Sequence, residues 1–143
     1  MRLTEDVNEL LDICDALKYF EKCKINANDF LLYMKQGIYN KILFPYVKYK
    51  GDKLIGCVVF QLTRDLNPGK VLNGVWMYVD PHYPKLHIKI AHLADSVALD
   101  KFADRIIICT QRKAEAAERR LNKFGYIAKY TLFEKEVKVY GSE

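Results

Sequence analysis

"VLNGVWMYVDPHYPKLHIKIAHLADSVALDKFADRIIIC" runs from Val71 to Cys109 and decides the fold. Residues 71–80 are rich in β-branched and aromatic side chains, which is typical of a strand. A loop with two prolines follows, and then a helical pattern whose apolar stripe is Leu86, Ile90, Leu93, Val97 and, one turn on, Phe102. Residues 105–109 are a continuous apolar run, as expected for a strand that is covered on both sides. A strand, a helix and a strand in this order predict a crossover unit with parallel strands and the helix on one face.

The chain before this unit predicts two helices and a hairpin. Apolar residues recur at helical spacing over 6–19. A second helix is expected over 28–36, with Asn26 or Asn28 as its N-cap and Gly37 as its stop. Residues 42–65 then alternate and are rich in Val, Ile, Tyr and Phe, with Gly51-Asp52 at a turn, which indicates a β-hairpin.

The chain after the unit predicts one more helix, over 112–124, with Gly125 as its C-terminal stop. Residues 126–140 are expected to form one long strand or two short ones. The whole chain of 143 residues therefore predicts a single α/β domain, residues 1–143. Its mixed central sheet is antiparallel at first and parallel at the centre, with helices on both faces.

Composition excludes several classes of protein. Half of the residues are apolar and 29% are charged, which is ordinary for a globular protein. No apolar run approaches the roughly 20 residues that span a bilayer. The first 20 residues carry acidic side chains early and lack the apolar core of a signal peptide, so we expect an intracellular protein.

No metal site is expected. The four cysteines are scattered without a paired spacing. His82, His87 and His92 are five residues apart, and five residues of helix turn by about 500°, so these side chains do not share a face.

A basic cluster lies in the last predicted helix. Glu115 and Glu118 interrupt it at helical spacings, which favours a solvated helix face, and a contact with nucleic acid is the alternative. The cluster comprises Arg112, Lys113, Arg119, Arg120 and Lys123.

Several short motifs stand in a recognisable order. Residues 53–62, "KLIGCVVFQL", are a hairpin strand with an Ile-Gly pair. Val79-Asp80-Pro81 ends the next strand as V-x-P, and Phe124-Gly125-Tyr126 closes the last helix in the manner of L-G-F. This ordered set resembles the GCN5-related N-acetyltransferase (GNAT) family, over residues 53–62 and 74–130.

The resemblance implies a fold, a cofactor and a mechanism. Acetyl-CoA would lie in a splay between two parallel strands, with its pantetheine arm on the backbone of Met77, Tyr78 and Val79. Its pyrophosphate would lie at the start of the next helix, around Lys85, His87, Ile88 and Lys89, where backbone N–H groups and the helix dipole favour an anion. An amine would then attack the thioester carbonyl, with a base taking the amine proton and an acid protonating the thiolate.

The sequence departs from the family at its functional positions. The loop R/Q-x-x-G-x-G/A has Pro84, His87 and Lys89 in place of its three defining residues. Pro84 lacks an N–H, and His87 and Lys89 add side chains where glycine lets the backbone approach a phosphate. The usual tyrosine position is Leu121, the usual asparagine position is Ala114, and the usual glutamate falls near Val75 or Trp76. Tyr126, Tyr130 and His82 are the candidate catalytic replacements.

Two hypotheses follow. The first is an acetyltransferase-like protein with a degenerate acetyl-CoA site, which serves as a non-catalytic binding or structural module with a protein partner or a second copy of itself. Small phage-encoded acetyltransferase-like proteins that act as virion components or host-directed factors are similar in type. The second is an active N-acetyltransferase with a divergent pyrophosphate loop.

Overall fold

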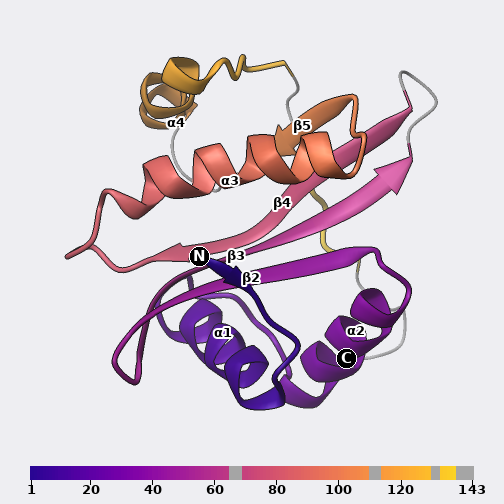
Figure 1. The fold of residues 1–143 in the computed structure, drawn as a ribbon, viewed down its shortest axis with the longest axis vertical. Coiled ribbons are helices and arrows are strands. Elements are labelled where there is room, and N and C mark those ends of the chain that lie inside the picture. The colour runs from indigo at the N-terminus through magenta and orange to yellow at the C-terminus, as the bar shows by residue number, and fades with distance from the viewer. Residues whose placement is uncertain (65–68, 110–113, 130–132, 138–143) are drawn as a thin grey trace. The chain divides into compact units, whose positions relative to one another are not determined.

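The computed structural model describes residues 1–64, 69–109, 114–129 and 133–137. These fall into two compact units, Met1–Cys109 and Thr110–Glu143. The first unit is a five-stranded sheet with helices on both faces (Figure 1). The expected α/β fold with a mixed sheet is thereby confirmed, whereas the assignment of all 143 residues to one domain stays a prediction.

The sheet has the strand order β1-β2-β3-β4-β5. Its first four strands pair antiparallel, and β4 pairs parallel with β5, as the crossover predicted. The parallel pair lies at one end of this described sheet rather than at its centre. The strands are β1 (Arg2–Leu3), β2 (Leu43–Lys50), β3 (Lys53–Arg64), β4 (Lys70–Val79) and β5 (Arg105–Ile108).

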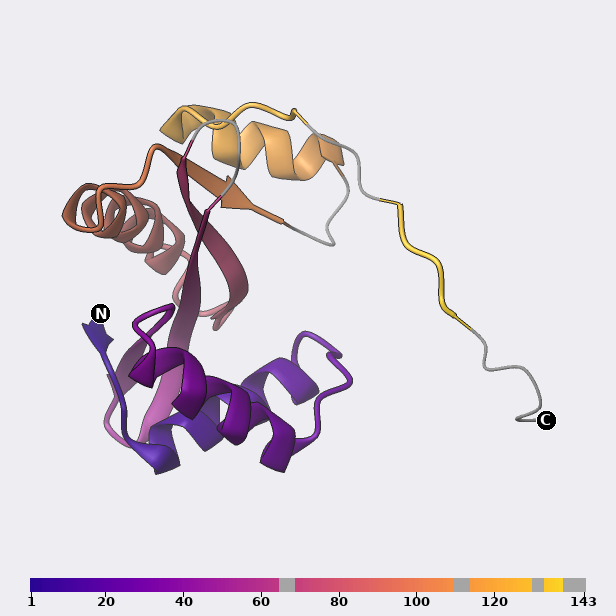
Figure 2. The ribbon, with the colours of Figure 1, turned by 90° about the vertical axis from the view of Figure 1, so that its right-hand side faces the viewer.

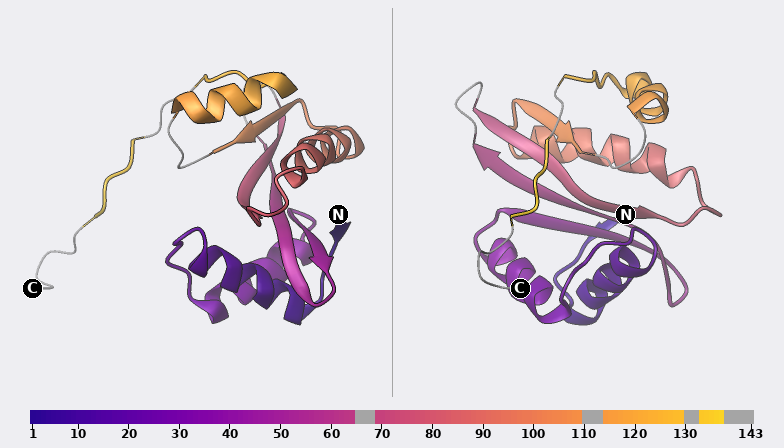
Figure 3. Two further views of the ribbon diagram at one scale, coloured as in Figure 1. Left: turned by 90° about the vertical axis from the view of Figure 1, so that its left-hand side faces the viewer. Right: turned by 180° about the vertical axis from the view of Figure 1, so that it is seen from behind.

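Each face of the sheet has its own core. Helices α1 (Val7–Tyr19) and α2 (Ala27–Tyr39) cover one face, and α3 (Leu86–Asp100) covers the other (Figures 2 and 3). The core below α1 and α2 includes Leu10, Ile13, Leu17, Phe30, Met34, Val47, Cys57, Val59 and Tyr78. The core below α3 includes Phe44, Val58, Phe60, Leu72, Ile90, Ala94 and Val97.

The ends of the first two helices follow local signals, with one exception. Asp6 caps α1 by accepting from the N–H of Glu9, and Asn26 caps α2 by accepting from two N–H groups. Gly37 was expected to stop α2, but the helix continues to Tyr39, so this prediction is wrong. The glycine serves a close approach instead, because a Cβ built there would lie 2.2 Å from Leu43 Cδ1.

Two expectations about the crossover unit are also corrected. Phe102 was placed on the buried stripe of α3, but the helix ends at Asp100 and Phe102 is 81% exposed. Its φ of 56° turns the chain away from the helix direction, so the stripe cannot continue to it. The strand β5 was expected to be covered on both faces, and all four of its residues are only half-buried in the structure.

The second unit contains α4 (Ala114–Leu121) and one turn of 3-10 helix over Asn122–Phe124. Gly125 follows with a φ of 86° and ends the helical segment, as predicted. None of the described residues in 126–129 and 133–137 is in a strand, so the expected strands are absent there, while 130–132 and 138–140 lie outside the described residues. An alternating pattern alone does not produce a strand, because strand preference depends on the neighbours with which the segment can pair.

Across the described ranges, no helix combines the length and the apolar composition that a membrane span requires.

Candidate functional site

The site is built where β4 leaves β5. The two strands pair from Val71↔Arg105 to Gly74↔Ile108 and no further. At the same point β4 has a bulge, because Phe60 of β3 pairs with Gly74 while Val59 pairs with Trp76, which leaves Val75 as an extra residue. A bulge increases the local twist and bends its strand. Among the described residues, β4 from Trp76 to Val79 therefore has a strand partner on one side only.

The backbone of this segment presents two residues to its open edge. In an antiparallel pair, successive residues direct their N–H and C=O groups alternately toward and away from the neighbouring strand. The Asp80 N–H donates to the carbonyl of Ile55, at 2.8 Å, which fixes the alternation. Tyr78 and Trp76 then bond toward β3, and the polar groups of Met77 and Val79 point to the open edge.

The side chains of the same segment alternate between the two cores. Trp76 and Tyr78 pack on the side of α1 and α2, while Met77 and Val79 pack on the side of α3. Tyr78 is 3% exposed, and its ring stacks on Phe20 with centroids 4.7 Å apart. Burial raises the pKa of the Tyr78 phenol, and Asp80 adds to this effect, so the hydroxyl stays protonated at neutral pH. Of the three predicted β4 residues, Met77 and Val79 thus offer backbone at the edge and Tyr78 does not.

A tight turn joins β4 to α3. Tyr83 N–H donates to the carbonyl of Asp80 at 2.9 Å, with Pro81 as the second residue of the turn. Asp80 favours the first position of such a turn because its side chain accepts from the backbone two residues on, and Pro81 fixes the φ that the second position needs. Here the Asp80 carboxylate accepts from the His82 N–H at 2.9 Å.

Asp80 is also the electrostatic centre of the turn. It is buried, and its carboxylate contacts Lys53 Nζ at 3.0 Å and His82 Nδ1 at 2.9 Å. The His82 N–H, and then the hydrogen bond from Lys53, lower the pKa of Asp80 to about 2. A carboxylate held this way is a poor base at neutral pH. His82, a candidate catalytic residue, is therefore tied to a structural carboxylate, with 84% of its side chain exposed.

The start of α3 differs from an open phosphate cradle. The first N–H groups of a helix usually lack partners within the helix, and these are the groups that bind anions. Here the N–H groups of Leu86, His87 and Ile88 donate to the carbonyls of Tyr83, Pro84 and Lys85, at 3.1–3.2 Å. Of the residues predicted to bind the pyrophosphate, His87 and Ile88 thus have their N–H groups engaged in short turns.

Positive side chains surround this helix start. Lys85 and Lys89 are exposed, and Lys50 Nζ lies 5.3 Å from the centre of the Tyr83 ring. Burial lowers the pKa of the Met1 amino group, and the nearby ammonium groups of Lys48 and Lys89 lower it further. An anion at the start of α3 would meet side-chain ammonium groups rather than backbone N–H groups.

The remaining candidate residues belong to the second unit or lie outside the described residues. Tyr126 is half-buried in the second unit, as is Leu121 at the usual tyrosine position, and Tyr130 lies outside the described residues. Arg119, Arg120 and Lys123 are exposed, whereas Arg112 and Lys113 are also outside the described part of the chain. The described residues contain no group of three or more His, Cys, Asp or Glu side chains that could hold a metal ion.

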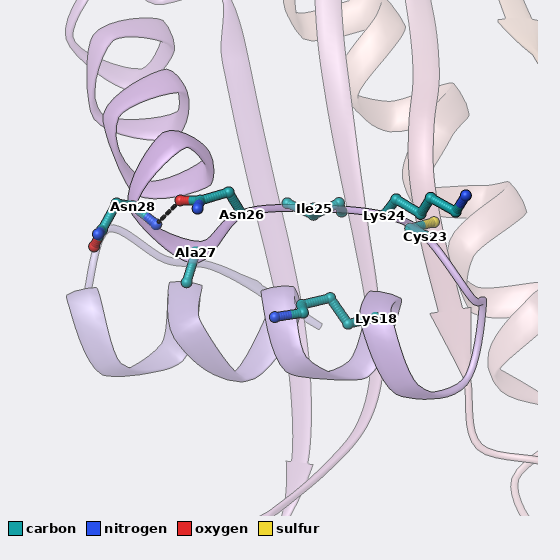
Figure 4. A pocket seen from close by; sticks show the side chains of 7 residues that line it. All are labelled: Lys18, Cys23, Lys24, Ile25, Asn26, Ala27 and Asn28. Carbon is teal, nitrogen blue, oxygen red and sulfur yellow. Dashed lines mark hydrogen bonds between the residues drawn. The ribbon is translucent and has the colours of Figure 1, made fainter. Parts of the chain in front are cut away.

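A hollow of about 580 Å³ lies at the loop between α1 and α2 (Figure 4). The amide oxygen of Asn26 is already used in capping α2, with Asn28 N–H at 2.9 Å. Sequence reasoning did not single out this hollow, because its residues carry no spaced motif. It is lined by Lys18, Cys23, Lys24, Ile25, Asn26, Ala27 and Asn28.

Comparisons by sequence find no matching family model and no matching curated protein. Comparisons by structure find acetyltransferases along nearly the whole chain. A predicted acetyltransferase from Clostridium acetobutylicum, solved with acetyl-CoA, has a TM-score of 0.75 at 12% identity and covers 94% of each chain. An aminoglycoside 6'-N-acetyltransferase from Acinetobacter haemolyticus has a TM-score of 0.71 at 14% identity, covering 96% of this chain and 100% of its own.

A third similar structure is AAC(6')-Iy in complex with a bisubstrate analogue of CoA, with a TM-score of 0.78 at 10% identity, covering 96% of this chain and 97% of its own. The chain therefore has the GNAT (acyl-CoA N-acyltransferase) fold, a mixed sheet with helices on both faces. At these identities the likeness establishes the fold, while function has to be argued from the site.

Proposed function

We propose that this protein binds acetyl-CoA along the open edge of β4 and transfers the acetyl group to an amine. One observation carries the proposal: the bulge at Val75, the end of pairing with β5 and the outward backbone of Met77 and Val79 coincide in one segment. Backbone N–H and C=O groups at a strand edge bind an extended ligand whatever their side chains are. The loss of the family's side chains therefore leaves this part of the site intact.

The two parts of the site have different tasks. The outward groups of Met77 and Val79 would hold the amide-containing arm of the cofactor by hydrogen bonds. Lys85 and Lys89 would meet its phosphates by charge, since the N–H groups of Leu86, His87 and Ile88 already have partners. When bound, acetyl-CoA supplies an activated acetyl thioester. The bond from the acetyl carbon to sulfur breaks as the bond to the amine nitrogen forms, and the amine proton passes to solvent or a base while the thiolate is protonated.

The first test is thermal unfolding with acetyl-CoA, because a ligand that binds only the native state raises Tm. We expect a rise with acetyl-CoA and a smaller rise with pantetheine, which lacks the phosphates. The double variant Lys85→Gln, Lys89→Gln should bind acetyl-CoA about 3- to 10-fold more weakly. Its affinity for pantetheine should be unchanged. Lys35→Gln, an exposed lysine on α2, is the matched control. If millimolar acetyl-CoA leaves Tm unchanged, the proposal is wrong.

A second candidate function is a non-catalytic module that binds a protein partner or another copy of this chain. It is favoured by the engaged N–H groups at the start of α3 and by the apolar residues Val75, Trp76 and Leu121 at the family's base and acid positions. Release of free thiol from acetyl-CoA in the presence of an amine separates the two. A stable complex or oligomer with no thiol release favours the module, and amine-dependent release favours the enzyme.

A further inference from the structure

An aromatic wall stands beside the bulge on the α1 and α2 side of the sheet. We define it as Trp76 of β4, Phe30 and Tyr33 of α2, and Gln61 of β3. The ring of Trp76 lies 5.4 Å from that of Phe30 and 5.8 Å from that of Tyr33, between centroids, with Tyr33 edge-on at 75°. Phe30 is 2% exposed and supports the indole from the core, while Tyr33 is 41% exposed.

Hydrogen bonds and packing hold this wall in one arrangement. Gln61 Nε2 donates to the Tyr33 hydroxyl oxygen at 3.2 Å, which links α2 to β3. On the same strands, Asn73 Nδ2 donates to Thr63 Oγ1 at 2.9 Å. The polar groups of the wall itself are thus an uncharged amide and a hydroxyl. A rigid aromatic surface of this kind binds an apolar or aromatic body by area and ring geometry.

The wall lies beside the open edge of β4, on the face of the sheet that α1 and α2 cover. On the opposite side, Met77 and Val79 pack against the closed core below α3. We therefore expect an amine that attacks an acyl group held at this edge to approach from the side of Trp76. This step rests on the proposed function.

We propose that the acetyl acceptor is a primary amine carried on an aromatic or apolar body, such as an arylalkylamine, and not a polycationic one. The four residues of the wall carry no charge, so they do not neutralise several ammonium groups. One carboxylate, that of the exposed Asp29, lies one helical turn before Tyr33, a spacing that puts the two residues on the same face of α2. The aromatic faces also attract one ammonium group by cation–π interaction.

The chain offers its own reporter, because Trp76 is its only tryptophan. Phenethylamine should quench or shift the Trp76 fluorescence of the full chain, and spermidine should not at equal concentration. With acetyl-CoA present, thiol release should show a KM at least about tenfold lower for phenethylamine than for spermidine.

Two variants test the wall itself. Tyr33→Ala changes an exposed part of it and should raise the KM for phenethylamine about 3- to 10-fold while the shift of Tm with acetyl-CoA is unchanged. Trp76→Leu should do the same more strongly, and because part of the indole is buried, its circular dichroism must first match the parent chain. Tyr39→Ala, an 86% exposed tyrosine on the same helix, is the matched control.

The outcomes separate this inference from the proposed function. If thiol is released and spermidine is preferred over phenethylamine, the inference about the acceptor is wrong, while the proposed acetyltransferase function stands. If phenethylamine quenches the fluorescence, Tyr33→Ala weakens this quenching, and no amine causes thiol release, then the aromatic site stands and the proposed enzyme function is wrong. Absence of both quenching and preference overturns the inference.

Discussion

Asp80 organises the turn on which the candidate site depends, through its contacts with His82 and Lys53. A carboxylate whose pKa falls from the ordinary 3.8 to about 2 on folding favours the folded state when it is ionised. Its contribution is complete above pH 4 and is lost as the pH falls toward 2. The turn should therefore be acid-sensitive in that window.

Asp80→Asn tests this. Asparagine can still accept from the His82 N–H, so the variant removes the charge and leaves the turn geometry. We expect a lower Tm at pH 7 and a shallower fall of Tm between pH 5 and pH 2, followed by circular dichroism. Asp52→Asn, an exposed carboxylate in the neighbouring hairpin turn, is the control. An acid slope identical to that of the parent chain would contradict this role of Asp80.

Gly37 is required by a contact with Leu43, which lies outside its helix. In an exposed helix interior, Gly→Ala stabilises by about 1 kcal/mol. Here the added Cβ would lie 2.2 Å from Leu43 Cδ1 and 2.9 Å from Leu43 Cβ, so a change of rotamer alone does not relieve the clash.

We therefore expect Gly37→Ala to destabilise the protein by about 1–2 kcal/mol, measured by urea unfolding. Gln36→Ala, at the adjacent exposed position, should have no such cost. If Gly37→Ala were as stable as the parent, the approach of α2 to Leu43 would be looser than described.

At the scale of the element, alternate residues of β4 have different roles. Tyr78 and Trp76 use their backbone to hold the sheet, and Met77 and Val79 present theirs to the open edge. A backbone ester, which replaces one N–H by oxygen, distinguishes the two sets without changing a side chain.

An ester at Val79 should lower the affinity for acetyl-CoA about 5-fold, with little change in the Tm of the free protein. An ester at Tyr78, whose N–H faces β3, should lower Tm and leave affinity nearly unchanged. Affinity and Tm are measured by calorimetry on both proteins. Equal effects at the two positions would refute the assignment of edges.

At the scale of the whole molecule, both cores, as far as the described part of the chain shows, consist of residues before Thr110. We expect a chain that ends at Cys109 to keep a cooperative thermal transition and the buried environment of Trp76. Circular dichroism and tryptophan fluorescence should then report one coincident transition. A broad transition with no cooperativity would show that residues 110–143 are needed for the first unit to fold.

The sequence was informative where local chemistry decides structure. Asn26 as a cap, Gly51 at a turn and the crossover from β4 to β5 all follow from signals within a few residues, and the structure confirms them. The motif V-x-P located the strand end of the candidate site correctly.

The rest depends on contacts between distant segments. Val75 is an ordinary β-branched residue, and only pairing with β3 makes it a bulge. The wall joins Tyr33 to Trp76 and Gln61, which share no local pattern. The engagement of the Leu86 and His87 N–H groups is likewise set by the turn geometry around Pro84 rather than by a readable motif.

The open edge of β4 has a consequence for the protein when nothing is bound to it. An unpaired strand edge is a template on which another chain can add and aggregate. In β4 the open part is short, and it ends at a bulge on one side and at Asp80-Pro81 on the other. Bulges and prolines are the features by which natural sheets discourage such additions. The residues that delimit the proposed cofactor site thus also protect the free protein from self-association through its backbone.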